Sequence, residues 1–242
     1  MCRMIAAPPG ISGELLINPF VRMAQGLNAI NEHNKELGTF THGHGWGAIV
    51  ADGSEDKAIR SVRACWDNEA IDTLRHQTIY FLHARLASKG AVALGNVHPF
   101  DAVVNGKQWS YCHNGTVRQP LETPSSLNRS DSTDSEKVFH QLLRHIEKGQ
   151  VLEGIRATYG AIDDFTSLNS FLLGPEALWV VCLYTEMPDY YTLYLSATEF
   201  GPVISSEILA ELDTQPVALS NGEILRIDRT SGHVDSFRME EL

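Results

Sequence analysis

The chain has 242 residues, of which 43% are hydrophobic and 20% are charged. This composition is typical of a globular protein and excludes a disordered, collagenous or coiled-coil chain. The net charge of −11 repels phosphate backbones and anionic lipids, so we expect neither nucleic-acid nor membrane-surface binding. The longest apolar run, residues 177–184, is far shorter than the roughly 18 residues that cross a bilayer.

Cysteine usage and chain organisation indicate the compartment and the number of domains. The cysteines are widely scattered and no export signal precedes them, which favours reduced thiols in a cytoplasmic protein. No repeat, low-complexity run or change of composition divides the chain. We therefore expect a single domain over residues 1–242.

The first part of the chain mixes strands and helices. Phe20–Leu37 carries apolar residues at helical spacing and ends at Gly38, which predicts a helix. Thr133–Lys148 is the clearest helical segment, with a capping box from Thr133 to Glu136 at its start. Strands are predicted at Cys2–Ala7, Trp46–Ala51, Thr78–Ala84 and Trp109–Cys112.

Strands dominate after residue 168. Asn221-Gly222 is a strong turn dipeptide and predicts a hairpin between the strands on either side of it. Mixed elements followed by antiparallel strands indicate an α+β fold rather than a doubly wound sheet. The predicted strands are Asn169–Leu173, Leu178–Leu183, Tyr190–Leu195, Val217–Leu219 and Glu223–Asp228.

Cys2 is the first candidate for chemistry. Removal of Met1 would leave a thiol and a free α-amine on the same residue. A model α-amine titrates near 8, so part of it is neutral at physiological pH and could accept the proton of the thiol. Position alone equally fits a buried structural cysteine on a first strand.

Three further positions carry polar groups suited to a substrate. Arg85 ends an apolar strand, where a guanidinium could bind a carboxylate or form a surface ion pair. Asn114-Gly115 could form a turn or an oxyanion hole, in which the Asn114 amide and the Gly115 N–H meet a developing alkoxide. Asp134 could stabilise its helix or accept a substrate ammonium group.

Two other patterns favour neither a metal nor a nucleotide. His42 and His44 lack a third ligand at metal spacing. The glycines between them and after them do not form GxGxxG and do not follow a predicted strand. We therefore expect no metal and no cofactor.

In order, these elements resemble the class II glutamine amidotransferase domain of the N-terminal-nucleophile hydrolases, and most closely its compact stand-alone members. The resemblance implies a four-layer αββα sandwich of two antiparallel sheets. The matching motifs are Cys2, residues 42–47 (HGHGWG), 83–85 (HAR), 88–90 (SKG), 96–100 (NVHPF), 113–115 (HNG), 133–137 (TDSEK), 205–207 (SSE) and 221–223 (NGE).

The resemblance also implies roles for the site residues. Cys2 would be the nucleophile, with its α-amine as the base, and Asn114 and Gly115 would form the oxyanion hole. Arg85 would hold the α-carboxylate of the substrate and Asp134 its α-ammonium. Ser88 and His98 match positions that line the family's glutamine pocket, although Leu86-Ala87-Ser88 departs from the Trp-Ala-Thr of many synthase-type members.

The expected activity is hydrolysis of the γ-amide of L-glutamine through a γ-glutamyl thioester, which releases ammonia and glutamate. With no acceptor domain before Leu242, transfer of the ammonia would need a separate synthetase or acceptor subunit. Two alternatives remain open. The first is hydrolysis of a larger γ-glutamyl amide, as in the ergothioneine-pathway members of the family, and the second is a catalytically idle regulatory subunit.

Overall fold

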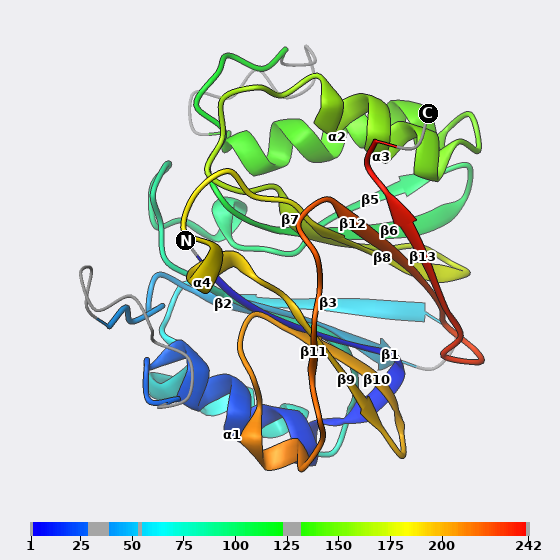
Figure 1. The fold of residues 1–242 in the computed structure, drawn as a ribbon. Coiled ribbons are helices and arrows are strands. Elements are labelled where there is room, and N and C mark those ends of the chain that lie inside the picture. The colour runs from blue at the N-terminus through cyan, green and yellow to red at the C-terminus, as the bar shows by residue number, and fades with distance from the viewer. Residues whose placement is uncertain (1, 29–38, 53–54, 123–131, 241–242) are drawn as a thin grey trace.

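The computed structural model describes residues 2–28, 39–52, 55–122 and 132–240. In this part of the chain, two antiparallel sheets lie face to face and helices cover their outer sides (Figure 1). The strand order is β11-β9-β10-β1-β4-β2-β3 in sheet A and β13-β12-β8-β7-β6-β5 in sheet B. The α+β, αββα architecture expected from the sequence is confirmed.

The strands of sheet A are β1 (Cys2–Ser12), β2 (Trp46–Asp52), β3 (Glu55–Ser61), β4 (Thr78–Arg85), β9 (Tyr194–Thr198), β10 (Gly201–Ser205) and β11 (Val217–Ala218). Those of sheet B are β5 (Phe100–Val104), β6 (Lys107–Asn114), β7 (Asn169–Leu173), β8 (Ala177–Cys182), β12 (Glu223–Asp228) and β13 (Val234–Arg238). The α-helices are α1 (Gly13–Ala24), α2 (Asp134–Ile146), α3 (Val151–Gly160) and α4 (Pro188–Tyr191), with short 3-10 helices at Cys65–Asp67, Glu69–Leu74, Leu94–Asn96 and Ala210–Leu212.

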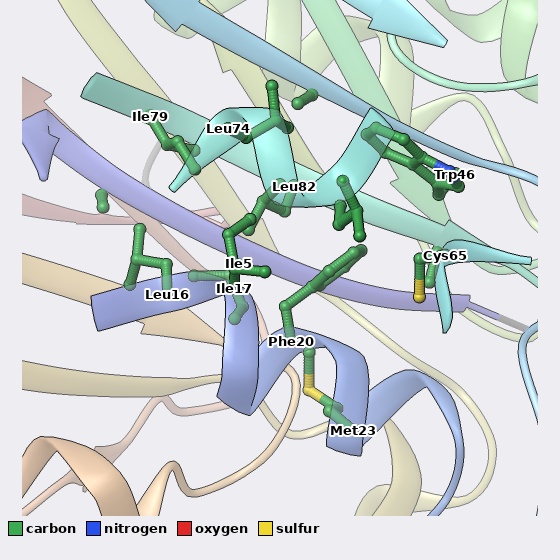
Figure 2. Close-up of a cluster of buried hydrophobic side chains, with 14 of the residues drawn as sticks. Ile5, Leu16, Ile17, Phe20, Met23, Trp46, Cys65, Leu74, Ile79 and Leu82 are labelled. Carbon is green, nitrogen blue, oxygen red and sulfur yellow. The ribbon is translucent and has the colours of Figure 1, made fainter. Parts of the chain in front are cut away.

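Helix α1 covers the outer face of sheet A. Its N-cap is Ser12, whose hydroxyl accepts a hydrogen bond from the Glu14 amide at 3.3 Å. Its buried stripe packs on side chains of β1, β2 and β4, as Figure 2 shows for Phe20 of α1 near Ile5 of β1. Burial of such a stripe is the main source of stability for a helix of this length.

Helices α2 and α3 cover sheet B, and a third apolar cluster fills the space between the sheets. Side chains alternate along a strand, so each sheet contributes one set to the middle layer and one to an outer layer. On β1, Met4 and Ala6 point between the sheets while Ile5 and Ala7 pack toward α1. Cys2 lies two residues before Met4, so its side chain points to the same face of β1 and therefore into the space between the sheets.

The predicted helix at Phe20–Leu37 was wrong in its start and end. The structure places the helix at Gly13–Ala24, because the Ser12 cap and the buried Leu16 and Ile17 lie upstream of the expected pattern. Leu27, counted in that pattern, is 56% exposed. The remainder of the prediction, residues 29–38, lies outside the described residues.

The predicted hairpin at Asn221-Gly222 was also wrong. Gly222 has a positive φ of 82°, but the turn joins β11 of sheet A to β12 of sheet B, and β12 pairs with β8 and β13 instead. The Asn221 side chain bonds the backbone of Tyr184 at 2.9 Å through both its oxygen and its nitrogen. The dipeptide therefore turns the chain from one sheet to the other.

The predicted strand at Tyr190–Leu195 divides into two elements. Pro188 opens the short helix α4 after Met187, which has a positive φ of 47°. Strand β9 begins only at Tyr194. A proline suits the first turn of a helix because its missing N–H has no helical partner there.

Candidate active site

Cys2 is the first residue of β1, the strand between β4 and β10 in sheet A. Its partner across the ladder is Arg85 at the end of β4. The residue is 6% exposed. This register brings the candidate nucleophile and the candidate carboxylate-binding guanidinium to the same edge of the sandwich.

Asn114 reaches Cys2 from the opposite sheet. It is the last residue of β6, and its Oδ1 accepts a hydrogen bond from the backbone nitrogen of Cys2 at 2.6 Å. Its Nδ2 is buried and has no hydrogen-bond partner among the described residues. A buried amide donor without a partner is costly in free energy, so this N–H pair is the first candidate for binding a ligand oxygen.

Gly115 follows Asn114 at a position where no other side chain fits. A Cβ there would lie 1.8 Å from the backbone oxygen of Ser167. The neighbouring His113 holds the same region, since its Nε2 is 3.0 Å from that oxygen and its Nδ1 is 2.8 Å from Ser135 Oγ. A carbonyl only accepts, so Nε2 carries the hydrogen and Nδ1 accepts from the Ser135 hydroxyl.

Arg85 organises the loop that follows β4. Its guanidinium donates to the carbonyl oxygens of Lys89 at 2.9 Å and Ala91 at 3.2 Å. Burial lowers the pKa of Arg85, while the charges of Cys2 and Asp134 act in the opposite direction. These two bonds use only part of the five-donor set of an arginine.

Asp134 lies at the start of α2 and borders the same space. Its Oδ2 accepts from the Val117 amide at 2.7 Å. At Gly90 an added Cβ would lie 3.2 Å from Thr133 Cγ2 and 3.7 Å from Arg85 Nη2. The loop after β4 therefore packs on the N-terminus of α2, next to both charged groups.

Ser88 and His98 occupy different surroundings. Ser88 Oγ is 2.8 Å from Thr116 Oγ1, beside the Asn114-Gly115 segment, and is exposed. The His98 ring is enclosed, with centroid distances of 4.3 Å to His83 and 4.6 Å to Phe100. The structure thus places Ser88 at the rim and His98 in the interior behind Arg85.

Burial lowers the pKa of both His83 and His98, and that of His83 falls to about 3. Both are neutral at physiological pH as a result. Within the described residues, neither ring nitrogen of His98 has a hydrogen-bond partner.

Sequence reasoning missed a residue that touches the candidate nucleophile. The hydroxyl of Tyr190 in α4 donates to the carbonyl oxygen of Cys2 at 3.3 Å. No local pattern marks this tyrosine, because its position depends on the packing of α4 against the end of β1.

The described residues contain no group of three or more His, Cys, Asp or Glu side chains that could hold a metal ion. They contain no helix with the length and apolar character needed to cross a membrane.

The chain belongs to the family described as "Glutamine amidotransferases class-II", which matches residues 33–169. The matched region includes Arg85, Asn114 and Asp134 and begins after Cys2.

Curated relatives and solved structures agree with this family. The chain is 32% identical over 115 residues to the Escherichia coli protein named "Putative glutamine amidotransferase YafJ", a match that covers 45% of each chain. A relative from Haemophilus influenzae, named "Putative glutamine amidotransferase", is 29% identical over 114 residues, which cover 45% of this chain and 39% of that protein. The matches thus span less than half of these relatives.

Two solved structures share the fold. Glutamine phosphoribosylpyrophosphate amidotransferase from B. subtilis aligns with a TM-score of 0.68 at 12% identity, over all of this chain and 50% of that one. A glutamine aminotransferase class-II domain protein from Silicibacter pomeroyi aligns with a TM-score of 0.57 at 15% identity, over 98% of this chain and 99% of that one.

Proposed function

We propose that this chain hydrolyses the γ-amide of L-glutamine, with Cys2 as an N-terminal nucleophile after removal of Met1. The observation that carries the proposal is the contact between Cys2 and Asn114. The side-chain oxygen of Asn114 accepts from the nitrogen that would become the α-amine, while its buried Nδ2 has no described partner. One amide thus orients the base and offers a donor to the substrate.

The first half-reaction forms a thioester. The neutral α-amine of Cys2 takes the proton of the thiol, and the sulfur attacks the amide carbon of glutamine. Asn114 Nδ2 and the Gly115 N–H donate to the oxygen that becomes negative. The C–N bond then breaks, and the α-ammonium returns its proton to the departing nitrogen, which leaves as ammonia.

The second half-reaction releases glutamate. The α-amine deprotonates a water molecule, which attacks the thioester carbon. The same two donors stabilise the second oxyanion, and the C–S bond breaks as the sulfur recovers the proton. Arg85 holds the α-carboxylate and Asp134 the α-ammonium throughout. Ser88 lies at the rim of the pocket, and the buried His98 ring supports the pocket from the interior.

The fate of the ammonia depends on what receives it. The site residues act on the amino-acid end of the substrate, and that end is common to glutamine and to every γ-glutamyl amide. We propose that the ammonia is released or passed to a separate synthetase or acceptor subunit. No metal or organic cofactor takes part in the proposed steps.

The test combines intact mass with turnover. The purified chain should lack Met1, release ammonia from glutamine, and yield γ-glutamyl hydroxamate when hydroxylamine intercepts the thioester. Cys2→Ser should abolish all turnover, whereas the matched control Cys182→Ala, in the core between the sheets, should retain it. Full activity in protein that keeps Met1 would exclude the α-amine as the base.

A substrate panel separates the remaining alternatives. A preference above about a hundredfold in kcat/KM for a bulky γ-glutamyl amide, worth about 2.7 kcal/mol, would replace glutamine as the substrate. An absence of turnover on every member of the panel, together with no labelling of Cys2, would favour an idle subunit.

A further inference from the structure

A buried polar cluster lies behind Cys2, on the side of β1 that faces α1. Arg3 points to this side, because alternate residues of a strand share a face and Ile5 and Ala7 point there. We call Arg3, His42, Tyr190 and Glu207 the anchor cluster. Each of these residues is at most 3% exposed.

An ion pair fixes Arg3. Its Nε lies 2.6 Å from Glu207 Oε1, and its guanidinium carbon lies 4.0 Å from the centroid of the Tyr190 ring. The other oxygen of Glu207 accepts from Asn28 Nδ2 at 2.9 Å. Buried charges are tolerated when they are paired in this way, so the residue after Cys2 is held by both Glu207 and Tyr190.

Tyr190 extends the cluster to Cys2 itself. Its hydroxyl has one proton, which it donates to the Cys2 carbonyl oxygen at 3.3 Å, and it accepts from His42 Nε2 at 2.9 Å. The imidazole of His42 therefore carries its hydrogen on Nε2 rather than on Nδ1, which lies 3.3 Å from Ala24 O. His42 is held in turn by its own backbone, whose N–H donates to Ala24 O at 2.7 Å. The hydroxyl that touches the nucleophile thus belongs to a side chain fixed by both α4 and the loop before β2.

A nucleophile at a chain end needs such contacts. After loss of Met1, only one peptide bond would hold Cys2, and terminal residues are poorly ordered unless they are tied down. Misplacement of a reacting group by about 1 Å can reduce a rate by about 10²-fold. Asn114 holds the nitrogen of Cys2 and Tyr190 its carbonyl oxygen, so the two bonds restrain the residue from opposite ends of its backbone.

We propose that Tyr190 is a positioning residue for Cys2 and that the anchor cluster orients the thiol and the α-amine for attack. This inference rests on the proposed function. Tyr190 acts through the backbone of Cys2 and makes no contact with the substrate in the mechanism above. Its loss should therefore reduce kcat and leave KM for glutamine unchanged.

The kinetic test compares two buried hydroxyls. Tyr190→Phe removes the bond to Cys2 but keeps the ring over Arg3, and should lower kcat by about 10- to 100-fold. Tyr159→Phe is the matched control. It removes a hydroxyl that bonds Ser170 and Tyr111 on the outer side of sheet B and should leave kcat unchanged. Equal kcat values in the two variants would overturn the proposal.

A second measurement reports the bond directly. Protein labelled with [1-¹³C]cysteine gives a carbonyl resonance for Cys2. This resonance is assigned by its absence from the spectrum of the Cys2→Ser variant. Tyr190→Phe should move this resonance upfield, whereas Tyr159→Phe should not move it. An unmoved Cys2 resonance in folded Tyr190→Phe protein would contradict the anchoring. If Tyr190→Phe moves the Cys2 resonance but the wild-type protein shows no turnover, the anchoring is supported and the proposed function is refuted.

Discussion

The backbone nitrogen of Cys2 and the side-chain oxygen of Asn114 are 2.6 Å apart, although 112 positions separate them and they belong to different sheets. The contact is made where β1 and β6 reach the same edge of the sandwich. This bond joins the candidate base to the candidate oxyanion hole.

The first prediction concerns cysteine reactivity. Burial raises the pKa of Cys65 and of Cys182 to about 12 and that of Cys112 well above its ordinary value. These thiols therefore stay protonated and unreactive at pH 8. A glutamine-derived diazoketone should add once, at Cys2, as measured by intact mass and peptide mapping. All four cysteines should react with iodoacetamide after denaturation, and an adduct at another cysteine in the folded protein would contradict the assignment.

The second prediction separates the two roles of Asn114. Asn114→Asp keeps an oxygen that can accept from Cys2 but loses the Nδ2 donor, so kcat should fall by about 10²–10³ while KM changes little. Asn114→Ala loses both groups, so its kcat should fall at least as far. Steady-state kinetics with glutamine measure both effects. A normal kcat with a raised KM would place Asn114 in substrate binding instead.

The third prediction concerns Arg85 and Asp134, the proposed partners of the charged groups of the substrate. Arg85→Ala and Asp134→Ala should raise KM, because the α-substituents are held alike in the ground and transition states. A hydrogen bond to a charged group contributes about 1.5–3 kcal/mol, so kcat/KM should fall about 10- to 150-fold for each variant. Exposed Arg63→Ala is the control. Unchanged kinetics for either site variant would show that the pocket lies elsewhere.

The fourth prediction is a loss of stability in acid. Because the pKa of His83 is about 3 in the folded chain and 6.5 in the reference state, the unfolded chain binds more protons between these values. The free energy of unfolding should therefore be highest above pH 6.5 and fall on acidification, by about 1.4 kcal/mol per pH unit for such a histidine. Burial of His98 acts in the same direction.

Urea unfolding at pH 7.5 and pH 5 measures this loss. His83→Leu should make the difference between the two pH values smaller, because one protonation site is removed. His76, whose side chain is 83% exposed, provides the control His76→Ala. An equal pH difference in the wild type and in His83→Leu would show that His83 is not the source.

Local sequence patterns predicted the elements that local chemistry determines. The capping box at Thr133 is present, since its hydroxyl accepts from the Glu136 amide at 3.2 Å. The strands predicted at Cys2–Ala7 and Thr78–Ala84 correspond to β1 and β4, although β1 extends further, to Ser12. The Asn221-Gly222 turn was predicted correctly as a turn, but turn chemistry does not specify which sheet the next strand joins.

The site could not be predicted from sequence periodicity. Taken one by one, the candidate residues had ordinary structural explanations, and only their order along the chain pointed to a family; these residues are Cys2, Arg85, Asn114 and Asp134. Tyr190 had no pattern at all, because its contact with Cys2 depends on where a four-residue helix packs. Contacts between residues this far apart in the chain follow from tertiary packing and cannot be derived from short-range spacing.

The central place of β1 in sheet A also has a consequence for biosynthesis. The strand that carries Cys2 pairs with β4 on one side and with β10, some 200 residues later, on the other. While the ribosome is still translating the segment before β10, one edge of β1 has no neighbour and its beginning remains open to the solvent. The removal of Met1 that the proposed function requires would therefore have most of the translation time available, before the late strands complete the sheet around Cys2.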